Sequence, residues 1–446
     1  MINRIFKARS EFSRNIIVLM SGTMIAQALP IALSPILTRL YSPSEFGTYG
    51  LYLAIVGIVS SLATGRYELS IMLPKKETDA INLVVLSLLI TLSVSLILAL
   101  VVVLFNRPIV AVLGNENISL WLYFLPISVA IAGIFQSLKY WNTRKKQYKR
   151  LAGTNVLRSS ATATTNLSFG LSGLSSSGLI LGNIFGHLIA SIFLVRKSVE
   201  DDKKILLFVN QDRVLLLAKK YIKFPKFDTP AALTFSVYSN MTVIFFNKFF
   251  EAATAGYYFF ANRLLKLPFS FFVSSFSDVF YQHLSQETSS EKIANEINKF
   301  SIKLVKIILV PFILVVYSSK YYVGIVFGEE WIDLYKYMYI FSLPILLSLC
   351  LSPYGHALKI IDRQDVSMMS HFARLIVLSL YFLSYFVIDY NLLVFVYIFS
   401  LLDSLMHIIL AFVVDFTIKN MQIMKMSIIR LSIWASIAVT NYLLLI

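Results

Sequence analysis

The stretch AINLVVLSLLITLSVSLILALVVVLF, residues 80–105, decides the fold of this chain. It holds no charged residue and is longer than the roughly 20 residues that an α-helix needs to cross a bilayer. Apolar runs of similar length recur along the whole sequence, which is 57% hydrophobic and only 14% charged over its 446 residues. Soluble domains carry about 25% charged residues. The chain is therefore predicted to be an all-α integral membrane protein with no separate soluble domain.

Apolar runs between charged, proline and glycine breaks predict twelve transmembrane helices. They lie near 15–38, 46–66, 80–105, 118–141, 151–171, 177–196, 225–250, 254–280, 301–320, 334–358, 368–388 and 391–416. A further apolar run, 427–446, either spans the membrane or lies at its surface, which leaves room for 13 or 14 helices. The first run continues past Ala26-Gln27-Ala28, so it is read as a retained helix and not as a cleaved signal peptide.

The positive charges fix an orientation for these helices. Of the 40 lysines and arginines, 31 fall in the segments on one side of the predicted membrane and five on the other. Positive charge is retained on the cytoplasmic side, so the N-terminus is predicted to be cytoplasmic. The net charge of +16 is then a consequence of topology and of attraction to anionic lipid heads, and it does not indicate a nucleic-acid partner.

An internal repeat divides the chain. ILTRLYSPSEFGTYGLY from Ile36 matches FFNKFFEAATAGYYFFA from Phe245 at an offset of 209 residues, with Gly47 opposite Gly256. The offset equals six predicted helices. Two parallel six-helix lobes, 1–200 and 225–418, are therefore predicted, related by an axis along the membrane normal and joined by a cytoplasmic connector, 201–224. Residues 419–446 form the additional segment.

Four cations lie deep inside predicted helices, where an ionised side chain is costly and usually functional. They are Arg158, Arg263, Lys266 and Arg374. Facing a central cavity, they would suit an anionic substrate such as a diphosphate, since arginine holds phosphate oxygens in a fork. The alternative is that some of them reach the cytoplasmic face or pair with acids such as Asp403.

Other polar residues in the spans are weaker candidates. Asp403 and His407 are four apart on one helix face, so they form either a structural pair or a proton or sodium relay. Gln27, Asn166 and Asn240 are candidates for lining a cavity. Glycines recur every fourth residue in GLILGNIFG, residues 178–186, and predict close helix contact. The histidines have no metal-ligand spacing, and the lone Cys350 lies in an apolar run, so no metal site is predicted.

Several motifs follow one another at a characteristic spacing. They are LTRLYSPSEFGTYGLY at 37–52, GRYELSIMLPKKETDA at 65–80, YWNTRKKQYKRLA at 140–152, FPKFDTPAAL at 224–233, GYYFFANRLLKLPFSF at 256–271, FGEEWIDLYKYM at 327–338 and ALKIIDRQ at 357–364. In this order they resemble the Wzx-type polysaccharide flippases (O-antigen and capsule) of the multidrug/oligosaccharidyl-lipid/polysaccharide exporter superfamily.

The resemblance implies a protein of the bacterial inner membrane that is not an enzyme. By alternating access it would move an undecaprenyl-diphosphate-linked oligosaccharide to the outer leaflet, with a polysaccharide polymerase and a chain-length regulator as partners. No cofactor is implied beyond coupling to a proton or sodium gradient. Family members line a central cavity with cations, and the four cations named above are the candidates for that role here.

Three other functions fit the sequence less well. A drug antiporter of the same fold would favour acidic residues in its cavity, whereas cations predominate here. A membrane polymerase or ligase needs a large external loop, and no outside segment exceeds about 20 residues. A scaffold without transport has only the packing glycines in its favour.

Overall fold

The computed structural model describes residues 18–284, 290–352, 354, 358, 363–388 and 391–417, and within them the chain is helical without a β-strand. Each of the twelve predicted spans overlaps at least one described helix, and residues 15–17, 353 and 355–357 of two spans lie outside the described residues. The further apolar run, 427–446, lies outside the described residues. Five described helices are long and apolar enough to cross a membrane, and up to seven are if each of two bent pairs forms one span.

The helices divide after Gly256 into two compact units. The helices of the first unit are α2 (Ser34–Leu40), α3 (Pro43–Ser60), α4 (Tyr67–Ser70), α5 (Glu77–Leu113), α6 (Ser119–Leu122), α7 (Leu125–Arg144), α8 (Tyr148–Leu171), α9 (Ser175–Leu206), α10 (Gln211–Lys220) and α11 (Thr229–Phe249). Those of the second are α12 (Ala252–Leu284), which begins in the first unit, α13 (Ser290–Tyr317), α14 (Ser319–Phe327), α15 (Leu334–Cys350), α17 (Gln364–Ser384) and α18 (Leu392–Thr417).

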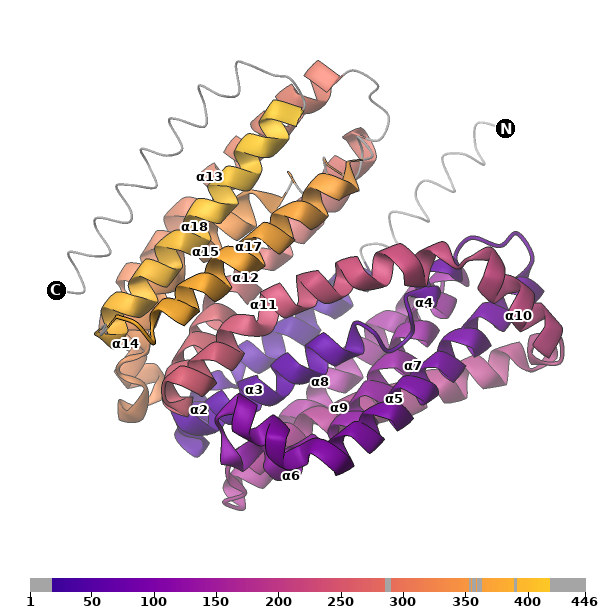
Figure 1. The fold of residues 1–446 in the computed structure, drawn as a ribbon, viewed down its shortest axis with the longest axis horizontal. Coiled ribbons are helices and arrows are strands. Elements are labelled where there is room, and N and C mark those ends of the chain that lie inside the picture. The colour runs from indigo at the N-terminus through magenta and orange to yellow at the C-terminus, as the bar shows by residue number, and fades with distance from the viewer. Residues whose placement is uncertain are drawn as a thin grey trace. The chain divides into compact units, whose positions relative to one another are not determined.

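The first unit is a bundle in which α7 packs against both α5 and α9, and α11 runs along α3 (Figure 1). The short α10 lies across one end of α5, where Arg213 donates two hydrogen bonds to the Asp79 carboxylate at 2.8 and 2.9 Å. Compactness thus groups α11 with the helices before it. The six-helix lobes predicted from the repeat, with their boundary in the connector 201–224, stay a prediction.

Two consecutive residues with positive φ lie in the turn between α3 and α4. Gly65 (φ +56°) and Arg66 (φ +61°) adopt the left-handed conformation that only glycine adopts without strain. Arg66 then lies 3.3 Å from the Glu68 carboxylate, which is buried and also accepts a hydrogen bond from Thr64. The GRYEL motif therefore forms the turn that leads into α4 around a buried carboxylate.

The repeat has a counterpart in contacts within the first unit. A Cβ added to Gly47 would lie 1.8 Å from the carbonyl oxygen of Ala252, and one added to Gly256 would lie 1.8 Å from that of Pro43. Pro43 and Ala252 are themselves separated by the repeat offset of 209 residues. The close approach is thus reciprocal, and each glycine leaves room for a backbone carbonyl from the other copy of the repeat.

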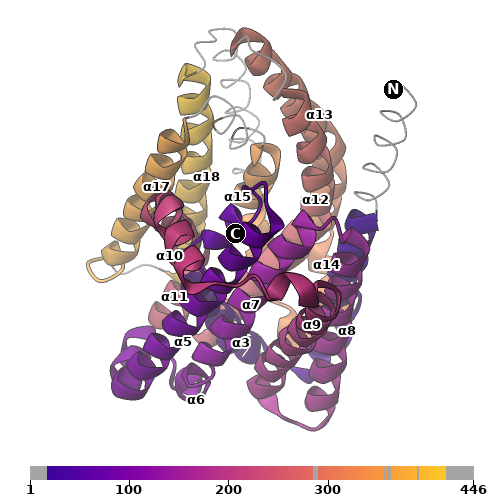
Figure 2. The ribbon, with the colours of Figure 1, turned by 90° about the vertical axis from the view of Figure 1, so that its right-hand side faces the viewer.

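In the second unit α15 lies between α13 and α18 and is buried along most of its length (Figure 2). Its last residue, Cys350, is buried, as predicted. Ser400 of α18 donates a hydrogen bond to the backbone carbonyl of Ile340, which ties the two helices together.

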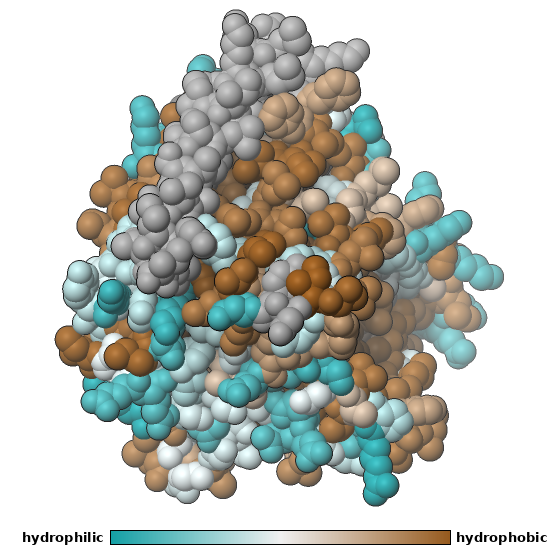
Figure 3. Space-filling view, turned by 60° about the vertical axis from the view of Figure 1, so that its left-hand side comes forward, coloured by the Kyte–Doolittle hydropathy of each residue, from teal (hydrophilic) through white to brown (hydrophobic). Residues whose placement is uncertain are grey.

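Large apolar side chains are exposed over much of the surface (Figure 3). On α5 they form a helical stripe made of Leu89, Leu92, Leu96, Leu100 and Val103. An exposed apolar stripe of this length is unfavourable in water and is expected for a helix that faces lipid.

Candidate functional site

The glycine stripe of α9 holds α8 close and thereby positions Arg158. A Cβ added to Gly182 would lie 1.8 Å from Asn166 Oδ1, and one added to Gly186 would lie 1.9 Å from Thr162 Oγ1 and 2.9 Å from the backbone oxygen of Arg158. The predicted role of these glycines in close helix contact is confirmed.

Arg158 belongs to a group of residues in the first unit that we call the cationic cluster: Arg158, Lys139, His187 and the ring of Phe135. The guanidinium carbon of Arg158 lies 5.6 Å from the centroid of the Phe135 ring. The Phe135 ring also makes an edge-to-face contact with the His187 ring, with the two centroids 6.4 Å apart. Lys139, one helical turn beyond Phe135 on α7, lies close enough for electrostatic repulsion with Arg158.

The cationic cluster is not neutralised from within. Among the described residues, neither Arg158 nor Lys139 forms an ion pair. Arg158 is half-buried and Lys139 is exposed, so both can reach a ligand. An uncompensated pair of cations beside an aromatic ring is suited to binding an anion.

Sequence reasoning did not single out Lys139. It lies near the end of a predicted span and was counted with the basic residues of the cytoplasmic side. Its spacing of four from Phe135 could have placed both on one helix face.

A second group, in the second unit, consists of Arg374 on α17 with Asp403 and His407 on α18, and we call it the buried triad. The Nε and Nη2 atoms of Arg374 lie 2.9 and 2.6 Å from Asp403 Oδ1. Its Nη2 and Nη1 also lie 2.7 and 3.1 Å from the two ring nitrogens of His407. Only 4% of Arg374 is exposed, so its charge is satisfied inside the unit.

The other two predicted cations lie on α12. Lys266 is exposed and close enough to the buried triad to be repelled by Arg374 and attracted by Asp403. Arg263, one turn earlier, is half-buried and, among the described residues, forms no ion pair. The structure therefore groups Lys266 with Arg374, and Arg263 lies one turn from Lys266 on α12.

The three polar residues predicted to line a cavity occupy different surroundings. Asn166 is buried against α9, and its backbone carbonyl accepts a hydrogen bond from Tyr41 at 2.7 Å. The side-chain amide of Asn240 donates to the Ser236 carbonyl at 2.8 Å. Gln27 is half-buried. Their roles as lining groups stay predictions. No group of three metal-ligating side chains lies together in the described part of the chain.

Comparison with known proteins assigns this sequence to a family. The family model described as "Polysaccharide biosynthesis protein" matches residues 36–336. The chain belongs to this family. No curated protein matches the sequence.

Solved structures with similar folds are transporters and flippases. A multidrug resistance MATE family transporter of the MOP superfamily, in an inward-facing conformation, matches with a TM-score of 0.66 at 14% identity, over 90% of this chain and 98% of its own. The lipid II flippase MurJ, in an inward closed conformation, also gives 0.66, at 13% identity over 97% of each chain. A MOP superfamily transporter from Pyrococcus furiosus gives 0.55 at 13% identity over 91% of this chain and 95% of its own. This member of the polysaccharide biosynthesis family is thus an all-α membrane protein with the two-lobe transporter fold.

Proposed function

We propose that the protein is a flippase that moves an undecaprenyl-diphosphate-linked oligosaccharide repeat unit from the inner to the outer leaflet of the bacterial inner membrane. The observation that carries the proposal is the cationic cluster. Arg158 and Lys139 lie together in an apolar bundle without a neutralising acid among the described residues. Arg158 lies within a predicted span, where an uncompensated cation is costly, and the exposed Lys139 adds a second positive charge. The pair therefore suits a multiply charged anion that enters and leaves.

Each group has a distinct role in this proposal. Arg158 and Lys139 bind diphosphate oxygens, Arg158 through its planar fork, and Phe135 holds the guanidinium from one side. Arg263 and Lys266 on α12 of the second unit are further candidates for binding diphosphate oxygens. The sugar crosses with the diphosphate by alternating access while the lipid tail stays in the bilayer.

The buried triad supplies a route to ion coupling. Arg374 is held by Asp403, so it reaches a substrate only when that pair opens. A proton or sodium ion that binds Asp403 would weaken the pair and free the guanidinium. The gradient would thereby set when Arg374 is available.

The biological setting follows from the sequence. The asymmetry of positive charge supports a cytoplasmic N-terminus. The family description supports a role in polysaccharide synthesis. We propose that the product is a surface polysaccharide, O-antigen or capsule, and that a polymerase and a chain-length regulator act after this protein. The protein itself performs no covalent chemistry in this proposal. A drug antiporter is the rival with the same fold, and the excess of cations disfavours cationic drugs as substrates.

The test is a deletion of the gene, followed by extraction of lipid-linked sugars and assignment of the leaflet that holds them. We expect complete, unpolymerised repeat units to accumulate in the inner leaflet and the intact gene to reverse this. Arg158→Gln should fail to restore transport and Arg158→Lys should restore part of it. Arg196→Gln, on an exposed residue of α9, is the matched control and should restore transport fully.

Other outcomes would redirect the proposal. Repeat units that reach the outer leaflet but stay unpolymerised would indicate a polymerase or ligase. An unchanged lipid pool would favour the small-molecule antiporter. Full transport by Arg158→Gln combined with Lys139→Gln would refute the cationic cluster as the substrate site.

A further inference from the structure

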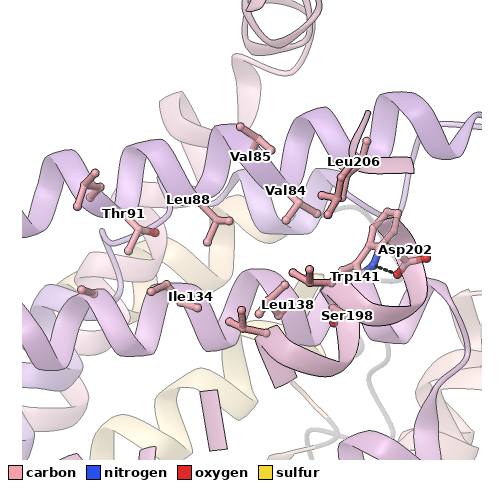
Figure 4. Close-up of a pocket in the computed structure, with 15 residues that line it drawn as sticks. Val84, Val85, Leu88, Thr91, Ile134, Leu138, Trp141, Ser198, Asp202 and Leu206 are labelled. Atoms are coloured by element: carbon pink, nitrogen blue, oxygen red, sulfur yellow. Dashed lines mark hydrogen bonds between the residues drawn. The ribbon is translucent and has the colours of Figure 1, made fainter. Parts of the chain in front are cut away.

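A cavity of about 350 Å³ lies between α5, α7 and α9 of the first unit, and we call it the slot (Figure 4). Side chains of α5 line one side, those of α7 form the floor, and α9 closes one end. Its lining residues are Ile81, Val84, Val85, Leu88, Thr91 and Leu92 of α5, Ala130, Ile134, Leu138 and Trp141 of α7, and Val195, Ser198, Val199, Asp202 and Leu206 of α9. Apolar cavities of less than half this volume, about 150 Å³, stay dry and bind small apolar molecules.

The lining of the slot is almost entirely apolar. The hydroxyl of Thr91 donates to the Ser87 carbonyl at 2.8 Å, and that of Ser198 accepts from the Asn142 amide at 2.9 Å. Asp202 accepts from the Trp141 indole at 2.8 Å (Figure 4). Because these polar groups already have partners, a sugar or a polar drug entering the slot would lose its own hydrogen bonds. The chemistry selects a hydrocarbon chain.

The slot is long and open to lipid. On each of the three helices its lining covers twelve residues from first to last, which is about 16 Å of helix. Its rim is made by Leu92, Val195 and Val199, which are 56%, 38% and 42% exposed. Leu92 belongs to the apolar stripe of α5. A chain of the surrounding bilayer can therefore enter sideways, without crossing water.

The polar end of the slot carries charges of both signs. Lys145 lies 2.7 Å from Glu77 and 3.3 Å from Asp202, and its ammonium sits 5.3 Å from the Trp141 ring centroid. A diphosphate would meet two carboxylates here for one ammonium. A headgroup with one positive and one negative charge meets partners for both.

We propose that the slot binds one acyl chain of a zwitterionic phospholipid from the surrounding bilayer, with the headgroup beside Lys145 and Glu77. The bound lipid is distinct from the transported substrate. On α7 the slot-lining positions 130, 134, 138 and 141 are turned by about a third of the helix circumference from Phe135 and Lys139 of the cationic cluster. The lipid chain fills the space between α5 and α9 that the side chains of α7 leave open.

The test compares the lipid retained by purified full-length variants. The protein is incorporated in bilayers of phosphatidylethanolamine and phosphatidylglycerol and then extracted in mild detergent. Native mass spectrometry gives the mass of the protein together with the lipid that it retains. We expect about one retained phosphatidylethanolamine per chain. Leu88→Trp fills the slot and should reduce retention by about tenfold, the effect of losing roughly two buried methylene groups. Leu89→Trp is the matched control, because Leu89 is the adjacent lipid-facing residue and does not line the slot.

A second variant and a second readout keep the test decisive. Val195→Trp fills the slot from the exposed rim and replaces Leu88→Trp if that variant does not fold. A phosphatidylethanolamine with a photoreactive group at its chain end should label the peptides around 88–92 and 130–134. Equal retention by wild type and both slot variants would overturn the proposal, as would labelling elsewhere. Displacement of the phospholipid by an equimolar polyprenyl diphosphate would also overturn it, since the slot would then serve the substrate.

Discussion

Arg374→Met is the substitution whose effect on stability the structure defines best. Methionine keeps much of the length of arginine but removes the guanidinium that donates to Asp403 Oδ1 at 2.9 and 2.6 Å. Charge-assisted hydrogen bonds contribute about 1.5–3 kcal/mol each. Breaking a buried ion pair costs about 3–5 kcal/mol, because the remaining charge is left uncompensated. We expect Arg374→Met to lower the free energy of unfolding by about 3–5 kcal/mol.

The single cysteine provides the assay. Cys350 is buried in α15 of the same unit, so a thiol-reactive fluorescent dye reports its exposure as the purified protein is heated in detergent. The double variant Arg374→Met with Asp403→Leu removes both charges and fills the site with apolar atoms. Replacing both partners of a buried pair is often close to neutral. We therefore expect the double variant to recover most of the lost melting temperature.

A double variant as unstable as Arg374→Met would refute the reasoning, because it would show that the loss does not come from the Asp403 carboxylate that Arg374 no longer contacts. Transport by the same proteins then separates structure from function. Recovery of both stability and transport would make the pair structural. Recovery of stability without transport would assign the charges to substrate binding or ion coupling.

Two further predictions concern the first unit. Gly47→Ala would place a Cβ 1.8 Å from the Ala252 carbonyl oxygen, so the backbone must move, and we expect a loss of about 1–3 kcal/mol in thermal unfolding. Gly57→Ala, whose Cβ meets a side-chain nitrogen at 3.3 Å, is the milder control, and equal losses would contradict the steric argument. The hydrogen bonds from Arg213 hold the pKa of Asp79 below its ordinary value. A carboxyl whose folded-state pKa is lowered stabilises the fold above its unfolded pKa of about 3.9, and this contribution is lost as the pH falls through the folded pKa. The attachment of α10 to α5 should therefore weaken in acid, and limited proteolysis of the connector should become faster there. Arg213→Ala should reduce this acid dependence, while the buried Val214 and Leu217 keep α10 attached at neutral pH.

The sequence predicted where the helices are better than where they end. The span predicted at 80–105 stops before Arg107 and Pro108, yet α5 continues to Leu113. The chain bends at Phe105, whose φ of −121° is not helical, and a bend there lets the helix resume beyond the break. The span predicted at 177–196 likewise extends to Leu206, because charged side chains such as Arg196 and Glu200 pair one turn apart and continue the helix outside the apolar part.

The candidate site was predictable only as far as local spacing reaches. Residues four apart share a helix face, so Asp403 and His407 could be paired from the sequence. The partner that decides their role, Arg374, is 29 residues from Asp403 and on another helix. Which cations are neutralised and which stay uncompensated depends on such packing between helices. For the same reason the link between Lys139 and Arg158 emerged only from the structure.

The reciprocal contact of Gly47 and Gly256 bears on the origin of the chain. In a two-fold symmetric dimer of identical subunits, residue i of one subunit meets residue j of its partner, and j meets i. The pairs Gly47 with Ala252 and Gly256 with Pro43 obey this rule when 209 is subtracted from the later residue of each. This is the pattern that a gene duplication would leave if a half-length ancestor had already assembled as a homodimer through this glycine. In such an ancestor a single codon change would have introduced two clashes at once, which is a strong reason for the glycine to persist in both copies.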